Sequence, residues 1–218
     1  MESYKRAFIS FLEEAGVLKF GDFTAKSGRK IPYFINAGEI KTGAQIARLG
    51  EFYAQAYLSR FGSEKAVLYG PAYKGISIAV SASIALAKNG VDVPFFFNRK
   101  EAKDHGEGGT FVGYVPQAGE NVVITEDVIT AGTAIRESVE ILSALPDVHI
   151  RAAFIMVDRR EKGLTSLSAA QEVEQAFGFP VCAVVDVYDI LAYLAEDPAN
   201  AENVARIQRY LAVNGAEK

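Results

Sequence analysis

Short apolar runs alternate along the chain with longer stretches in which apolar residues recur every three or four positions. Runs with few polar interruptions are typical of buried strands, and the longer periodic stretches are typical of helices that bury one face. The runs that predict strands span residues 65–70, 93–98, 121–127, 151–158 and 181–187. The stretches that predict helices span residues 4–15, 44–61, 75–90 and 134–145, with a capped surface helix after Asp197 and Pro198.

Strands that alternate with helices predict an α/β fold, in which helices flank a mostly parallel central sheet. The 218 residues suffice for one sizeable domain, and no repeat or low-complexity linker divides them, so we expect a single domain over residues 1–218. In such a sheet, ligands bind beyond the carboxyl ends of the strands. Candidate chemistry is therefore expected in the segments that follow the strands.

The composition narrows the classes of function. Half of the residues are apolar and 23% are charged, which excludes a mostly disordered chain. The net charge of −4 argues against a general nucleic-acid or membrane-surface binder, and no segment is long and apolar enough to span a bilayer. The single cysteine, Cys182, excludes an intrachain disulfide framework and is expected to be a small buried hydrophobe. We expect a cytoplasmic protein without nucleic-acid or membrane partners.

The most informative segment is VVITEDVITAGTA, residues 122–134, in which a strand, an acidic pair, a turn of small residues and a helix follow one another. The backbone N–H groups of the turn and the positive end of the helix could hold a phosphate, with hydroxyl donors from Thr130 and Thr133. Gly132 would allow close approach of the ligand. The glycine spacing and the Lys-Ser/Thr pair of a nucleoside-triphosphate P-loop are missing.

Glu126 and Asp127 place negative charge beside this phosphate site. Such carboxylates make sense if the ligand also carries hydroxyl groups near its phosphate, as ribose 5-phosphate does. They could also stabilise positive charge on the sugar when the bond at its anomeric carbon breaks. The alternative is an acidic pair that only caps a surface turn. The adjoining strand and the Thr-x-Gly-Thr turn favour the sugar-phosphate site.

The segment GPAYKG, residues 70–75, places Lys74 between two glycines in a turn that joins a strand to a helix. Backbone amides and one ammonium group in such a turn could hold a pyrophosphate. The alternative is an exposed lysine in an ordinary turn.

Residues 98–111 combine cations and glycines with almost no apolar anchor. A segment of this kind cannot bury itself, which predicts a mobile lid that closes over a polyanion and excludes water. The alternative is a solvated hairpin loop. The candidate phosphate donors of the lid are Arg99, Lys100, Lys103 and His105.

Five segments together carry a resemblance to a known family. They are FTAKSGRKIPYFINAG at 23–38, YGPAYKGI at 69–76, FNRKEAKDHGEGG at 97–109, VVITEDVITAGTA at 122–134 and VDRREKG at 157–163. With them the chain resembles, essentially from end to end, the type I phosphoribosyltransferases, and among these the members that act on orotate. The resemblance implies a glycosyltransferase of pyrimidine (UMP) biosynthesis. Its reaction would move the 5-phosphoribosyl group from 5-phosphoribosyl 1-diphosphate (PRPP) to orotate, giving orotidine 5′-phosphate and pyrophosphate.

The resemblance also implies roles for individual residues. The catalytic residues would be Lys74, Lys103, Glu126 and Asp127. The residues that contact PRPP would be Lys26, Tyr73, Lys74, Arg99, Lys100, Lys103, His105, Glu126, Asp127, Val128, Ile129, Thr130, Ala131, Gly132, Thr133 and Ala134. The residues that contact orotate would be Lys26, Phe34, Ile35, Thr130 and Arg159.

Two of these residues, Arg159 and Phe34, have side chains that suit the carboxylate and the ring of orotate. The planar fork of Arg159 suits a carboxylate, and Phe34 could form an apolar floor for the ring, although it could also be plain core. The sequence departs from the family pattern at two positions. Ile35 stands where close relatives often carry a second Phe, and Glu126 stands where many have Asp.

The family fold adds a small N-terminal hood over the base, here about residues 1–40. The resemblance further implies Mg²⁺ as the cofactor, held mainly by substrate oxygens and water, so that no dedicated metal residues are expected. It also implies a homodimer, in which the lid of one subunit, with Arg99 and Lys103, reaches the active site of its neighbour.

Two alternatives share parts of this pattern. A purine phosphoribosyltransferase would have the PRPP motif but should lack the set of Lys26, Phe34 and Arg159. A regulator that binds PRPP and then RNA or DNA would need a basic face or an appended DNA-binding domain, and we expect neither in this chain.

Overall fold

The computed structural model describes residues 1–25, 28–103, 109–129, 132–163 and 165–217. Its centre is a six-stranded sheet with the strand order β5-β4-β3-β6-β7-β8. All neighbouring strands are parallel except β5, which pairs antiparallel with β4 at one edge. The six strands are β3 (Val67–Gly70), β4 (Phe95–Lys103), β5 (Gly109–Gly113), β6 (Asn121–Thr125), β7 (His149–Asp158) and β8 (Val181–Asp186). The predicted α/β fold with a mostly parallel sheet is confirmed.

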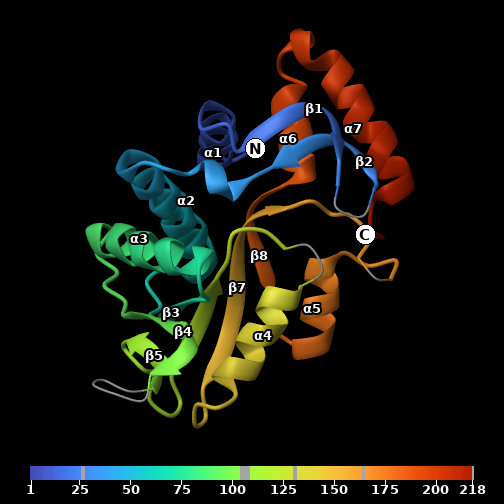
Figure 1. Cartoon of the computed structure of the whole chain (residues 1–218). Helices are drawn as coiled ribbons and strands as arrows, with labels where there is room; N and C mark the ends of the chain where they lie inside the picture. The colour runs from blue at the N-terminus through green and yellow to red at the C-terminus, as the bar shows by residue number, and fades with distance from the viewer. Residues whose placement is uncertain (26–27, 104–108, 130–131, 164, 218) are drawn as a thin grey trace.

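Helices cover both faces of this sheet (Figure 1). The two faces form separate apolar clusters because successive side chains of a strand point to opposite sides, so that Leu68 packs on one face while Val67 and Tyr69 pack on the other. The helices of the first cluster are α1 (Ser3–Glu14), α2 (Gly43–Phe61), α3 (Lys74–Lys88), α6 (Val187–Leu194) and α7 (Ala201–Asn214). The second cluster contains α4 (Thr133–Leu142) and α5 (Ala169–Phe177).

A second, smaller sheet lies beyond the central one. It consists of the antiparallel strands β1 (Leu18–Thr24) and β2 (Lys30–Ile35), which lie beside α7 in Figure 1. Tyr33 of β2 is fully buried, whereas the next residue, Phe34, is 38% exposed and packs against Phe23 at a ring-centroid distance of 5.6 Å. This two-stranded sheet was not predicted from the sequence.

Several strands and helices begin or end at other residues than predicted. The predicted strand 181–187 ends one residue earlier, because the Asp186 side chain accepts hydrogen bonds from the N–H groups of Tyr188 and Asp189 and so begins α6. Neither α6 nor α5 was predicted. The predicted surface helix after Asp197 is confirmed, as a single turn of 3-10 helix, Pro198–Asn200, followed by α7. In the described part of the chain, no helix has the length and apolar character needed to cross a membrane.

Candidate active site

Glu126 and Asp127 directly follow β6 and are held by backbone hydrogen bonds. The N–H of Glu126 donates to Phe154 O at 2.9 Å, Asp127 O accepts from Met156 N at 2.8 Å, and Glu126 O accepts from the Tyr53 hydroxyl at 2.5 Å. Both carboxylic side chains are buried, with residue exposures of 8% and 6%. The acidic pair therefore projects from rigid backbone at the carboxyl end of the sheet, where a ligand site is expected.

The two acids differ in their partners. Asp127 Oδ2 lies 2.6 Å from Lys74 Nζ, while Glu126 Oε1 accepts a hydrogen bond from the N–H of Asp127 at 2.9 Å. Burial raises the pKa of Glu126 from its ordinary value of 4.5 to about 8, and the charge of Asp127 adds to this effect. Burial therefore favours the protonated form of Glu126 in the free protein.

Lys74 reaches Asp127 because the turn 70–75 is packed tightly against the end of β6. A Cβ atom on Gly70 would lie 2.2 Å from the Gly75 carbonyl oxygen, and one on Gly75 would lie 2.7 Å from Thr125 O. Only glycine fits at either position without moving backbone. The peptide bond between Ala72 and Tyr73 in this turn is cis.

The buried Asn98 side chain joins this turn to β4. Asn98 Oδ1 accepts hydrogen bonds from the Tyr69 hydroxyl at 2.9 Å and from Ala72 N at 3.0 Å. Asn98 was not singled out from the sequence, although it stands directly after an apolar run at a predicted strand end, which was the available signal. It fixes the backbone of the candidate pyrophosphate turn.

The helix α4 begins directly after the predicted phosphate turn. Its N-cap, Gly132, has φ of 73°, and among the described residues no side chain caps the helix, so its first N–H groups could bind an anion. A Cβ atom on Gly132 would lie 2.9 Å from Val173 Cγ2, which adds a steric reason for glycine to the conformational one. The predicted contacts Thr133 and Ala134 are exposed in the first turn of this helix.

The cationic segment after β4 is more regular than predicted. Residues up to Lys103 continue β4, and β5 resumes at Gly109, so both arms form a hairpin. Arg99 Nη1 donates to the carbonyl oxygens of Gly109 and Phe111 at 3.0 and 3.3 Å, which holds the arms together. The arms therefore form a β-hairpin, and the turn between them lies outside the described residues. The lid over residues 98–111 stays a prediction.

Two predicted PRPP residues meet at the base of this hairpin. The ammonium group of Lys100 lies 4.9 Å from the centre of the Tyr73 ring, and both side chains are exposed. A cavity of about 430 Å³ opens between the pyrophosphate turn, the hairpin, Glu126 and α4. Among its lining residues are Ala72, Asn98, Arg99, Lys100, Glu126 and Ala134. Segments that are far apart in the sequence thus form one polar pocket.

Arg159 follows β7, the strand next to β6, and is largely buried. Its Nε and Nη2 atoms lie 3.0 and 2.7 Å from Glu161 Oε1, and its guanidinium carbon lies 5.1 Å from the centre of the Tyr33 ring. Burial acts to lower the pKa of Arg159, but Tyr33 and Glu161 outweigh it, so that its net pKa is raised and it stays charged. Tyr33 and Glu161 were not singled out from the sequence, because their meeting depends on the fold.

The other predicted contacts fall into three groups. Phe34 is exposed on β2, which argues against its being plain core, and Ile35 is half-buried at the end of that strand. Val128 forms a bridge with Val157, and Ile129 is buried in the sheet cluster, so only their backbone could face a ligand. Lys26, His105, Thr130 and Ala131, together with the side chain of Lys103, lie outside the described residues.

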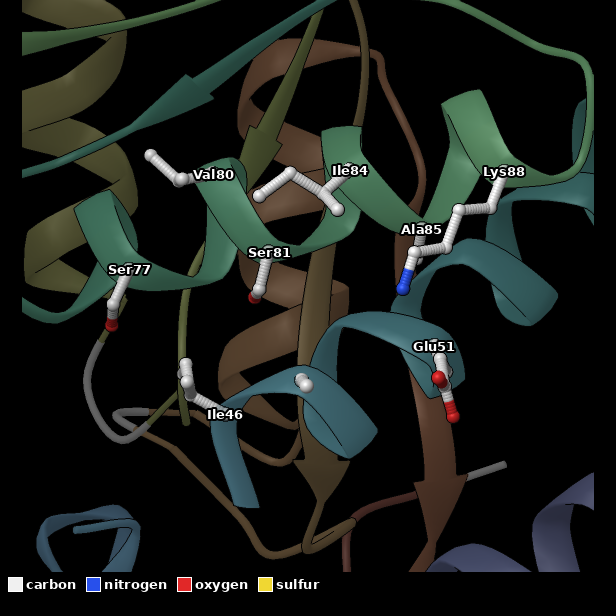
Figure 2. Close-up of a pocket in the computed structure, with 9 residues that line it drawn as sticks. Ile46, Glu51, Ser77, Val80, Ser81, Ile84, Ala85 and Lys88 are labelled. Atoms are coloured by element: carbon white, nitrogen blue, oxygen red, sulfur yellow. The ribbon is translucent and has the colours of Figure 1, made fainter. Parts of the chain in front are cut away.

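A second concave region lies away from these residues. It is a groove of about 330 Å³ between α2 and α3, and Figure 2 shows Ile46, Val80 and Ile84 along it, with Glu51 and Lys88 at one end. Its lining is mostly apolar and contains no cluster of polar groups suited to a sugar phosphate. The polar pocket at the strand ends is therefore the candidate active site.

A mostly parallel sheet with an acidic pair, the turn 70–75 and the start of α4 at its carboxyl end is the arrangement of the type I phosphoribosyltransferase fold. Residues 36–183, more than half of the chain, match the family of the phosphoribosyl transferase domain. The chain is 50% identical over 216 residues to the orotate phosphoribosyltransferase of Vibrio cholerae serotype O1, covering 99% of this chain and 100% of that one. The corresponding protein of Clostridium beijerinckii is 45% identical, with both chains fully covered.

The solved structure of the orotate phosphoribosyltransferase of Francisella tularensis matches with a TM-score of 0.85 and 38% identity, over 96% of this chain and 100% of that chain. The chain therefore belongs to the orotate phosphoribosyltransferase family. The prediction from the five sequence segments is confirmed at this level, and the purine alternative and the regulator are not supported.

Proposed function

We propose that this chain transfers the 5-phosphoribosyl group of PRPP to the ring nitrogen of orotate, giving orotidine 5′-phosphate and pyrophosphate in pyrimidine biosynthesis. The observation that supports the proposal is the contact between Lys74 and Asp127 at the carboxyl end of the sheet, in the segment that leads into α4. In the proposal, Lys74 would meet the diphosphate, Asp127 would meet the ribose, and the first amides of α4 would meet the 5-phosphate. The names of the full-length relatives supply the acceptor, orotate.

The chemistry follows from the charges at the site. Departure of pyrophosphate leaves positive character on the anomeric carbon and negative charge on the leaving group. Asp127 would accept hydrogen bonds from the ribose hydroxyls and stabilise the positive ring, and Lys74 would leave Asp127 to neutralise the diphosphate. The exchange of partners is feasible because the Lys74 side chain is 57% exposed. Glu126 would serve the ribose as a second acceptor once it is ionised.

Mg²⁺ is proposed as the cofactor and would supply further neutralisation of the diphosphate. The described residues contain no group of three or more acidic, histidine or cysteine side chains placed to hold a metal ion. We propose that the ion is bound mainly by substrate oxygens and water, because Mg²⁺ keeps several waters and takes few protein ligands. Asp127 is already paired with Lys74.

The base site is proposed to lie between the small sheet and the end of β7. Arg159 would hold the orotate carboxylate, and the exposed ring of Phe34 would face the base. We propose that residues 1–40 form the hood over this site. Support comes from the hydrogen bond of the Tyr33 hydroxyl to Glu161, which ties β2 to the segment after β7.

We propose that the enzyme is a cytoplasmic homodimer in which the lid of one subunit reaches the neighbouring site. The β4–β5 hairpin lies at the end of the molecule away from the β1–β2 sheet (Figure 1). A lid at this position is better placed to serve a second subunit than to cover the proposed base site of its own chain. Arg99, Lys100, Lys103 and His105 would supply its cations.

A base-specificity assay tests the proposal. Purified protein is incubated with PRPP, Mg²⁺ and, in separate reactions, orotate, uracil, adenine, guanine or xanthine, and pyrophosphate release is measured. We expect release with orotate and little with the other bases, because only orotate offers a carboxylate to Arg159. If a purine were turned over as fast as orotate, the orotate assignment would be refuted, but the chain would still be a phosphoribosyltransferase.

A further inference from the structure

Three hydrogen-bond donors converge on one oxygen of Glu161. Arg159 Nε and Nη2 lie 3.0 and 2.7 Å from Glu161 Oε1, and the Tyr33 hydroxyl donates to the same atom at 3.0 Å. Arg29 Nη1 lies 3.6 Å from the other oxygen, Oε2. The Glu161 side chain is only 13% exposed, so these contacts are shielded from water.

Glu161 occupies only one edge of the Arg159 guanidinium. The two hydrogen bonds to Glu161 come from Nε and Nη2, so neither of them uses Nη1. The Tyr33 ring lies against the guanidinium, with 5.1 Å between its centre and the guanidinium carbon. Arg159 is thus fixed along its Nε edge and can offer its terminal edge to a second carboxylate.

The backbone that carries Glu161 is held from both sides. Arg160 has φ of 50°, an uncommon conformation for a non-glycine residue, and its N–H donates to Asp158 Oδ1 at 2.8 Å. Its Nε lies 3.1 Å from Asp158 Oδ2 and 3.2 Å from Asp186 Oδ2. Glu161 itself forms an antiparallel bridge with Gly215, which follows α7. These contacts hold the backbone of Glu161 in place, as a positioning role for its side chain requires.

The charges of the cluster leave room for one more anion. Arg29 and Arg159 contribute two positive charges and Glu161 one negative charge, so the described cluster carries a net charge of +1. An incoming carboxylate would neutralise it without displacing Glu161. A buried guanidinium that lacked Glu161 would instead be costly and free to turn.

We propose that Glu161 is a positioning residue for the acceptor base, which fixes the Arg159 guanidinium so that its terminal edge receives the substrate carboxylate. This rests on the proposed function, which assigns that carboxylate to Arg159. Glu161 would stay in place when the base binds, because leaving would break three hydrogen bonds to Oε1 and strand the buried Tyr33 hydroxyl.

Two substitutions test the proposal by steady-state kinetics with each substrate varied in turn. Glu161→Gln keeps the shape but loses the charge, and Glu161→Asp keeps the charge but is one methylene too short to reach. We expect both to raise KM for orotate about tenfold, the loss of one charge-assisted contact, while kcat and KM for PRPP stay within about twofold. Glu14→Gln, which removes the exposed carboxylate paired with Arg48, is the matched control and should change nothing.

A double-mutant cycle separates this inference from the proposed function. If Glu161 acts through Arg159, adding Glu161→Gln to Arg159→Ala should change KM for orotate by less than about twofold. A fall in KM for orotate on Glu161→Gln would show that Glu161 competes with the substrate, and equal losses for both substrates would show a merely structural role. Either result overturns the proposal. An unchanged KM in Arg159→Ala alone would instead refute the base site of the proposed function.

Discussion

Lys74 Nζ lies 2.6 Å from Asp127 Oδ2, although the two residues are 53 positions apart in the sequence. This contact explains how a buried carboxylate can stand beside a site for a polyanion. In the free protein the lysine neutralises Asp127, and in the proposed complex the diphosphate and the ribose hydroxyls would replace each partner of the pair. We therefore propose that the replacement of the Lys74–Asp127 contact by contacts with the substrate links binding to catalysis.

Asp127→Asn tests the role of the negative charge at the ribose. The amide can still accept a hydrogen bond from a ribose hydroxyl but stabilises positive character on the sugar poorly, so kcat should fall by about a hundredfold while the fold remains intact. Pyrophosphate release and the melting temperature are measured side by side. Normal turnover by a folded variant would reduce Asp127 to a turn cap.

Arg159→Ala should weaken orotate far more than PRPP. The lost contact between a guanidinium and a carboxylate is worth about 1.5 to 3 kcal/mol, which corresponds to roughly a ten- to hundredfold rise in KM for orotate. Arg159→Lys should recover little, because a lysine cannot bond to Glu161 and to the substrate through one planar fork. Comparable increases in KM for the two substrates would contradict this assignment.

The sequence predicted the parts of the site that depend on local pattern. The acidic pair, the lysine turn and the glycine at the start of α4 all follow from residues that are adjacent in the chain. Asn98, Tyr33 and Glu161 could not be found in that way. Asn98 meets Ala72 across 26 positions and Tyr33 meets Glu161 across 128, so these contacts depend on the tertiary fold. Arg159 is only two positions from Glu161, but local pattern does not show that their side chains meet.

The differences between the predicted and the observed secondary structure also arise where the local pattern of apolar residues is not enough. The apolar run at 181–187 continues from β8 into α6, and the change of structure between them depends on one side chain, Asp186, which caps the helix. The small β1–β2 sheet was missed partly because β1 is irregular: its burial pattern does not alternate cleanly, and its pairing with β2 shifts register between Phe20 and Phe23. Hydrophobic periodicity alone carries no such information.

Gly132→Ala should damage the proposed phosphate site through the backbone. The left-handed φ of 73° costs alanine about 1 kcal/mol, and the new Cβ would also press on Val173, so we expect KM for PRPP to rise more than KM for orotate. Gly178→Ala is the matched control, since Gly178 has φ of 76° at the end of α5 and open space around it. If both variants lose stability equally and neither changes KM for PRPP, this glycine has no role in binding.

The raised pKa of Glu126 predicts a pH-dependent cost of folding. Its pKa is about 8 in the folded protein and near its ordinary value of 4.5 when unfolded, so between these values the folded state binds more protons. Stability from this group therefore falls as pH rises from about 4.5 to about 8. Glu126→Gln removes the effect but can keep the hydrogen bond from the Asp127 N–H. Melting temperatures of the ligand-free proteins should agree near pH 5 and favour the variant near pH 9, whereas a constant difference would place the cause elsewhere.

The proposed exchange of lids between subunits makes a prediction for mixed dimers. Lys103→Ala and Asp127→Ala would damage the same composite site from opposite chains, so each variant homodimer should be nearly inactive. Across a two-fold interface, one site of a mixed dimer collects both lesions, and the other combines an intact lid with an intact acidic pair.

Random reassortment makes half of the dimers mixed, each with one good site of two, so the activity should return to about a quarter of that of the unsubstituted enzyme. The two variants are unfolded together and refolded, and PRPP-dependent loss of orotate is compared with that of separately refolded variants. If the lid served the site of its own chain, each mixed dimer would carry one lesion in each site and no activity would return. The transferase assignment would survive that result, but the requirement for a dimer would not.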